Sequence, residues 1–210
     1  MAVSVVSICN AALRLVNVAT INDEKESSEQ ARACNALYDT ARDAILRAFV
    51  WNFARAFATL GPLASLTHPD WSYIYALPAN CLYAVRVFPS EKETLRPDPR
   101  LLYPGPADER FETAFMEGSQ VVMTNVEKAM MEYVYRVTDP TVFDPCFVEA
   151  LEYKLASLLA VPMTGNSQVA QYYASMANAA IVHASTLSAQ EGRRMPLKRP
   201  VTSRFEVSRR

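Results

Sequence analysis

Apolar residues recur at helical spacing near the N-terminus of the chain. Over positions 4–16 they fall every three or four residues, and the serine that opens this stretch can cap the first turn. Asn17 can adopt the left-handed conformation that closes a helix. A second helical stripe begins at Asp23 and Glu26, which have the spacing of a capping box, and continues to about Phe49. The pattern predicts two amphipathic helices joined by a short link.

The middle of the chain alternates apolar and polar residues with the two-residue period of β-strands. Alternating stretches are "WSYIYALP", "CLYAVRVF" and "MEYVYRV". The stretch "RFETAFMEGSQVVMTN" predicts a hairpin that turns at Glu117 and Gly118. Five of the thirteen prolines lie in the segment 89–108, which we expect to be a loop because proline cannot donate to a strand ladder. Together these signals predict an antiparallel sheet of about four or five strands.

Helical spacing returns after the predicted strands. Asp144 can cap a helix with Pro145 in its first turn, and we expect this helix to stop at Pro162. After the turn "TGN", Ser167 can cap a last helix that runs to about Gln190. The predicted fold is α+β: a four-helix bundle of two N-terminal and two C-terminal helices, with an inserted antiparallel β-sheet domain and an extended basic C-terminal tail.

These elements divide the chain into four predicted segments. Residues 1–50 form the N-terminal half of the bundle, 51–140 the inserted β domain, 141–190 the C-terminal half of the bundle, and 191–210 a basic arm. Large aromatic residues are expected to anchor the two domains to each other: Trp51, Phe53 and Trp71. Trp51 stands where the chain leaves the bundle for the sheet, and stacking on a ligand is the alternative role for it.

Charge is distributed unevenly along the chain. Half of the 210 residues are hydrophobic and a fifth are charged, which is typical of a soluble globular protein. The net charge of -1 combines a C-terminal segment, from Glu191 onward, of about +5 with a body of about -6. We expect the basic arm to contact a partner, the alternative being a solvated tail. The arm's candidate contact residues are Arg193, Arg194, Lys198, Arg199, Arg204, Arg209 and Arg210.

No motif of a common catalytic or cofactor site is visible. The five glycines form neither a dinucleotide-binding motif nor a P-loop. His68 and His183 match no catalytic signature, and we expect His183 to be packed in the core. Four carboxylates have ordinary surface spacing: Asp39, Asp43, Glu149 and Glu152. Arg42 and Asp43 are expected to pair with the sheet domain. The sequence therefore predicts no enzyme, no cofactor and no metal.

The cysteines indicate a reducing compartment. Cys9, Cys34, Cys81 and Cys146 lie far apart and lack the paired spacing of a zinc site. The N-terminus lacks the features of a signal peptide. We therefore expect reduced, buried thiols and folding in a cytoplasm.

The segment 155–190 contains no Asp, Glu, Lys or Arg, although a fifth of the whole chain is charged. Its polar residues interrupt it too often for a membrane span. A helix that faces bulk water usually carries charges, so the polar side of the last helix is a candidate for contact between protomers. A neutral solvent-facing surface is the alternative. The candidate contact residues are Gln168, Gln171, Ser175, Asn178 and Ser185.

Several motifs occur in a distinctive order: "ICNAAL", "RDAILR" followed by "WNFA", "PDWSYIYALPANCLYAVRV", and "FDPCFVEALEYKLASLLAVPMTGN". In this order they resemble the tail tubular protein A family, the head-to-tail adaptors of short-tailed bacteriophages. The similarity spans about residues 4–190. It departs from the family pattern at Asn17, where glycine is usual, and at Val50, where proline is expected before "WNFA". Both residues can keep the local geometry.

The resemblance implies a structural virion protein. Adaptors of this family form a twelve-fold ring beneath the portal protein, extend the DNA channel, and provide a platform for the tail nozzle, which is tubular protein B, and for the fibres. It thus implies a homo-oligomer at the head-to-tail interface, assembled in the host cytoplasm, with no membrane association. The basic arm would dock against the portal protein. Double-stranded DNA would pass through the channel without specific binding. A channel that must pass DNA should not bind it tightly, and each phosphate that the protein neutralises adds affinity.

Two other functions remain open at this stage. A nucleic-acid-binding helical module would use the basic arm, and its binding to DNA would weaken as salt increases. A hydrolase without a recognisable motif would lose turnover when His183 is replaced, without unfolding.

Overall fold

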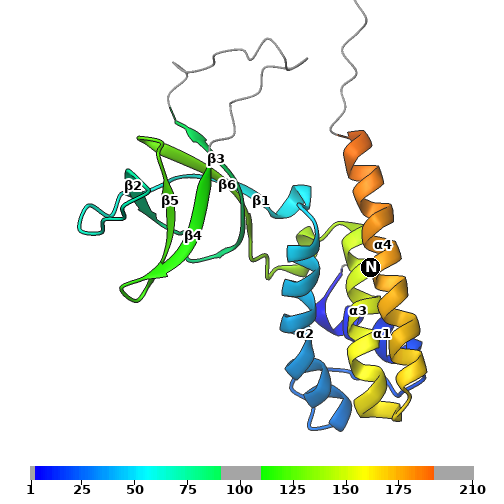
Figure 1. Cartoon of the computed structure of the whole chain (residues 1–210). Helices are drawn as coiled ribbons and strands as arrows, with labels where there is room; N and C mark the ends of the chain where they lie inside the picture. Colours follow the sequence, from blue (N-terminus) through cyan, green and yellow to red (C-terminus); the bar gives the residue numbers. More distant parts are fainter. Residues whose placement is uncertain (1–2, 91–109, 192–210) are drawn as a thin grey trace, which may run out of the picture.

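The computed structural model describes residues 3–90 and 110–191, with side chains as far as Leu187. These ranges show an α+β fold with four α-helices and two antiparallel sheets of three strands each. The helices gather on one side of the molecule and the strands on the other (Figure 1). The helices are α1 (Val5–Leu15), α2 (Glu29–Ala48), α3 (Pro145–Thr164) and α4 (Ser167–Glu191).

The first helix begins and ends as predicted. Ser4 caps α1 and accepts a hydrogen bond from the Ser7 backbone N–H at 3.1 Å. Asn17 follows the helix with a φ of 58°, in the left-handed region. The asparagine therefore keeps the geometry that a glycine would provide at this position.

The link between α1 and α2 is longer than predicted, because α2 begins at Glu29 and not near Asp23. Asp23 and Glu26 form a turn inside the link, where the Glu26 carboxylate accepts a hydrogen bond from the Asn22 backbone N–H at 3.0 Å. The cap of α2 is Ser28. The predicted capping box is therefore wrong, because acidic side chains at this spacing can also hydrogen-bond the backbone of a turn.

The third helix begins as predicted and ends later. Asp144 caps α3 and Pro145 is its first residue. Pro162 does not stop the helix, which continues to Thr164 and closes at Gly165 with a φ of 68°. A proline in the last turn removes one hydrogen bond and leaves the later residues free to stay helical. The predicted stop at Pro162 is therefore wrong.

Helix α3 lies at the centre of the helical part and contacts the other three helices. Its contact with α4 uses small residues of α4 such as Ala177, which is buried. The predicted cap of α4, Ser167, is wrong. Asn166 caps this helix, because its Oδ1 accepts hydrogen bonds from the N–H groups of Gln168 and Val169.

Two sheets form the rest of the described structure. The order of the first sheet is β1-β6-β3, from β1 (Arg55–Thr59), β6 (Ala129–Tyr135) and β3 (Cys81–Pro89). The order of the second is β2-β5-β4, from β2 (Tyr73–Ala76), β5 (Ser119–Thr124) and β4 (Phe111–Met116). The predicted strands and the hairpin at Glu117 and Gly118 are confirmed, with positive φ at both turn residues. The predicted single sheet of about four or five strands is wrong, because the described strands form two sheets of three.

The strand β1 was not predicted. Helical spacing continues through positions 45–60, but α2 ends at Ala48 and Phe49 is extended, with φ of −152° and ψ of 153°. A single turn of 3₁₀-helix, Asn52–Ala54, then leads into β1. Phe49 therefore has the extended backbone that a residue before proline also adopts.

The two sheets pack face to face, and the first sheet lies between the second sheet and the helices. Tyr75, Val122 and Met131 belong to the buried cluster between the sheets. Neighbouring positions of β6 point to opposite faces, so that Tyr133 joins this cluster and Val134 joins the helical core.

Charged residues also connect α2 to the strands. The Arg42 side chain is buried and donates hydrogen bonds to Asp39 and Asp43. Asp43 also accepts an ion-pair contact from Arg136, just after β6, at 2.9 Å. The predicted pairing with the sheet domain is therefore confirmed for Asp43, whereas Arg42 pairs with the two aspartates of its own helix.

Within the described ranges, no helix is both long enough and apolar enough to cross a membrane.

Candidate functional site

Trp51 lies where the chain passes from α2 to β1. Its side chain is only 3% exposed, and its Nε1–H donates to the Ile45 carbonyl at 2.9 Å. The rings of Phe49 and Phe147 meet it edge-on, with centroids 5.3 and 5.2 Å away. An indole that is covered and hydrogen-bonded in this way offers almost no surface for stacking on a ligand.

Phe53 extends this aromatic cluster toward the strands. Its ring lies 5.1 Å from that of Phe147 and 5.8 Å from that of Phe143, measured between centroids. Its carbonyl accepts a long hydrogen bond, 3.4 Å, from the Tyr135 hydroxyl of β6. Trp51 and Phe53 therefore lie at the junction of the helical and β parts, where the sequence placed them.

Trp71 lies elsewhere, so its predicted role as an anchor between the two parts is wrong. It belongs to a separate cluster with Ile74, Val121 and Met123 on the second sheet. The guanidinium of Arg110 lies over its ring, 5.4 Å from the centroid. The segment before β2 folds back over this sheet, which the local sequence pattern does not reveal.

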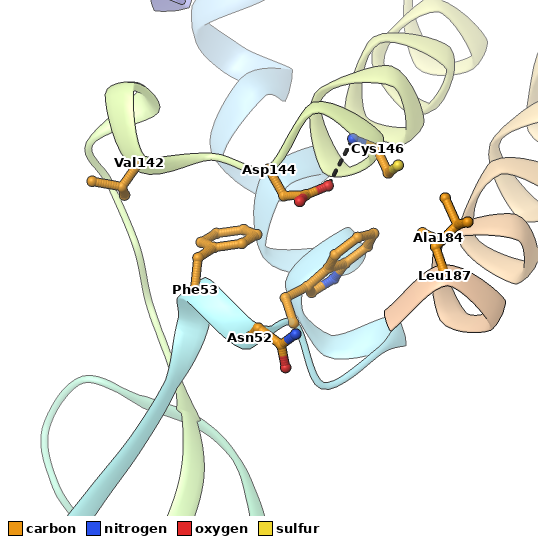
Figure 2. A pocket seen from close by; sticks show the side chains of 8 residues that line it. Asn52, Phe53, Val142, Asp144, Cys146, Ala184 and Leu187 are labelled. Carbon is orange, nitrogen blue, oxygen red and sulfur yellow. Dashed lines mark hydrogen bonds between the residues drawn. The ribbon is translucent and has the colours of Figure 1, made fainter. Parts of the chain in front are cut away.

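A small pocket of about 220 Å³ opens beside the junction (Figure 2). The Asp144 carboxylate in it accepts a hydrogen bond from the Cys146 N–H at 2.8 Å, so it is engaged in capping α3. The described lining residues include neither an imidazole nor a second carboxylate. They are Trp51, Asn52, Phe53, Val142, Asp144, Cys146, Ala184 and Leu187.

The outer side of α4 is uncharged and partly apolar. Tyr172 is 58% exposed and Val182 is 63% exposed, although both are large apolar side chains on the surface of the molecule. We define the exposed face of α4 by ten exposed residues that follow Ser167: Gln168, Gln171, Tyr172, Ser175, Asn178, Ala179, Val182, His183, Thr186 and Leu187.

Four of the five predicted contact residues on α4 lie on this face. The exception is Ser185, which is half-buried and donates its hydroxyl hydrogen to the Val182 carbonyl at 2.7 Å. His183 is exposed on the face as well. The prediction of a packed His183 is therefore wrong, because α4 turns its alanine-rich side to α3. The exposed Tyr172 and Val182 were not among the predicted contact residues.

His68 and Glu152 lie on different elements of the fold. His68 accepts a hydrogen bond at Nδ1 from the Asp70 N–H, at 3.2 Å. Burial, followed by the neighbouring charge of Glu149, raises the pKa of Glu152. In the part of the chain that the structure describes, no group of three His, Cys, Asp or Glu side chains could hold a metal ion.

None of the four cysteines forms a disulfide within the described ranges, and only two are buried. Cys9 of α1 and Cys34 of α2 are both buried in the helical core. A hydrogen bond with Cys34, followed by burial, raises the pKa of Cys9 far above its ordinary value. Cys81 and Cys146 are half-buried. The prediction of buried thiols is thus confirmed for the first pair.

The candidate arm residues all lie outside the described residues, which end at Glu191.

No family model matches this chain, and no curated protein matches its sequence.

Proposed function

We propose that this protein is a head-to-tail adaptor of a short-tailed bacteriophage. It forms a ring under the portal protein, extends the DNA channel, and carries the tail nozzle and the fibres. In this proposal the helices form a four-helix bundle, the strands form a domain inserted into it, and the basic arm docks on the portal. DNA passes through the ring without specific binding.

The residues of the family-like motifs support this proposal through their structural roles. In "ICNAAL", Ile8, Cys9 and Ala12 are buried in the helical core. Asn10 uses both ends of its amide on Ile21, at 2.8 Å each. The motif "WNFA" supplies the aromatic junction. These positions maintain an architecture, as expected of a protein that acts through its surfaces.

The observation that carries the proposal is the exposed face of α4. A surface helix in water normally carries charged residues opposite its buried side. Here Tyr172, Val182 and Leu187 are exposed among small polar residues, without a charged side chain as far as residue 187. Compared with the rest of a protein surface, the core of an interface contains fewer charged residues and more tyrosine and apolar groups. A head-to-tail contact of this face with another surface of a neighbouring copy forms a ring when the rotation between copies closes.

The test is assembly of the purified full chain with portal rings of the same phage, followed by negative-stain electron microscopy. Val182→Glu places a charge in the proposed interface and should prevent adaptor rings from forming. Val161→Glu is the matched control, because Val161 is also an exposed helical valine, at 50%, but lies on α3. Normal rings with Val182→Glu, or equal loss of rings with both variants, would contradict the proposal.

Truncation after Gln190 tests the arm. The shortened chain should remain folded by circular dichroism and no longer bind portal rings, because the cationic residues of the arm are gone. Normal portal binding would remove the docking role. Salt-sensitive DNA binding by the full chain, lost in the truncated chain, would favour the nucleic-acid-binding module instead.

A further inference from the structure

The two sheets are joined to each other along one side. Beyond β1, the Leu60 N–H still bonds the Ala129 carbonyl of the first sheet, at 2.9 Å. Directly afterwards the Gly61 carbonyl accepts from the Ala76 N–H, and the Leu63 N–H donates to Ile74, both on β2. The chain therefore crosses from one sheet to the other while it continues to make strand-like hydrogen bonds.

The opposite side of the two sheets is open. β3 and β4 are the outer strands there, and within the described ranges each pairs with another strand along only one of its edges. A groove of about 790 Å³ separates them, lined by residues from Cys81 to Val85 of β3 and from Phe111 to Phe115 of β4. The two sheets therefore resemble a barrel that lacks one strand.

The backbone of β4 presents a row of hydrogen-bonding groups to this groove. The two-residue turn makes Met116 and Ser119 a hydrogen-bonded pair, and such pairs alternate along a hairpin. The N–H and C=O groups of Phe111, Thr113 and Phe115 consequently point away from β5. The register of β4 is regular, and the strand contains neither lysine nor proline, two of the features that protect an edge strand; Glu112 is its one charged residue.

The side chains around the groove also leave apolar surface uncovered. Phe111 packs against the cluster between the sheets, and Phe115 lies on the same face of β4 four residues later. Phe115 is nevertheless 72% exposed, and Tyr83 across the groove is 45% exposed. A strand added beside β4 would cover Phe115, which the present strands leave exposed to solvent.

The groove carries one unpaired positive charge. Its lining includes Arg47, whose Nη1 donates to the Leu82 carbonyl at 3.0 Å and which forms no ion pair within the described part of the chain. The other charged side chains of the lining have partners: Arg136 pairs with Asp43, and Glu112 lies 3.5 Å from Arg110. An acidic side chain beside Arg47 would therefore complement the groove.

We propose that this groove binds an extended segment of a partner protein as an added strand on β4. The segment turns alternate apolar side chains toward Phe111 and Phe115 and places an Asp or Glu beside Arg47. Main-chain hydrogen bonds to Thr113 and Phe115 supply affinity, and the aromatic and charged contacts select the sequence. This inference goes beyond the adaptor proposal and does not depend on it.

The probe is a library of random ten-residue peptides displayed on yeast and selected against the purified full chain. Enriched peptides should alternate apolar residues and carry Asp or Glu near one end. Thr113→Pro removes the outward N–H and should lower the affinity of a synthetic enriched peptide about tenfold or more, measured by fluorescence anisotropy. Thr113→Ala keeps that N–H and should bind like the unaltered chain.

Arg47→Ala should weaken the same peptide and reduce the salt dependence of its binding. Thermal unfolding by circular dichroism shows that each variant is folded. Equal binding by Thr113→Pro, or no peptide selected, would overturn the proposal. If the chain instead self-associates and Thr113→Pro abolishes this, the edge belongs to a contact between copies and the proposal of a different partner is wrong.

Discussion

At the scale of single residues, a buried carboxylate organises the first sheet. The Glu132 side chain is 3% exposed and forms ion pairs with Arg55 of β1 and Arg86 of β3. Burial raises its pKa, but hydrogen bonds and positive charge from the two arginines outweigh burial and hold the pKa below the ordinary value of 4.5. Glu132 therefore joins three strands through its charge.

Replacing this carboxylate should make stability less dependent on pH. A group with a lowered native pKa stabilises the fold above its unfolded pKa, and this stabilisation is lost as pH falls through the native pKa. We expect Glu132→Gln to lower the free energy of unfolding by about 1–3 kcal/mol at neutral pH. The difference should shrink below pH 4.5. Urea unfolding across a pH series measures it.

The exposed Glu112→Gln serves as the control, because its contact with Arg110 is long and exposed to solvent. It should change stability little at any pH. If the difference in unfolding free energy between Glu132→Gln and the unaltered chain stays constant as the pH falls, the pKa of Glu132 is not lowered in the folded protein.

At the scale of elements, one asparagine positions the link between α1 and α2. Ile21 is 2% exposed, and the Asn10 amide satisfies both its N–H and its carbonyl. Asn35 makes a single comparable bond to the Glu24 carbonyl, at 2.7 Å, in an exposed region. The two asparagines hold the same link, but only the bonds of Asn10 replace water at a buried residue.

This difference predicts unequal effects of the same substitution. Asn10→Ala leaves two polar groups of Ile21 without partners and should destabilise the protein by about 2–4 kcal/mol. Asn35→Ala leaves a carbonyl that water can reach and should cost less than about 1 kcal/mol. Chemical denaturation of both variants measures the difference. Equal costs would show that the amide of Asn10 does not position the link.

At the scale of the whole molecule, the aromatic junction couples the helical and β parts. Trp51 and Trp71 are the two tryptophans of the chain, and they report on different regions. In Trp51→Ala, the fluorescence of the remaining Trp71 reports the β part alone, and far-ultraviolet circular dichroism reports mainly the helices. These two signals can therefore reveal whether the parts unfold together.

Trp51→Ala should cost about 3–5 kcal/mol and separate the two unfolding transitions, because it leaves a cavity at the junction. Trp71→Phe should leave one shared transition, since it changes only the outer cluster of the second sheet. Coincident transitions in Trp51→Ala, with a midpoint like that of the unaltered chain, would show that the junction does not couple the parts.

The helix starts at Ser4 and Asp144, the left-handed Asn17 and the hairpin at Glu117 could be predicted because they depend on residues within a few positions. The capping roles of Asp23 and Ser167 could not, since several nearby polar side chains compete for the same backbone groups. For the candidate site, sequence placed Trp51 and Phe53 at the junction, because the predicted N-terminal half of the bundle ends at residue 50.

By itself, then, the sequence determined the type and order of most elements, the caps of α1 and α3, and the absence of charge along α4 as far as its described side chains. Only the tertiary structure decided that β1 is a strand, that Trp71 faces away from the helices, and that Val182 and His183 are exposed. It also decided that β3 and β4 leave a groove between them. The reason is that strand pairing and burial depend on contacts between distant segments, whereas caps and turns are made by neighbours in the chain.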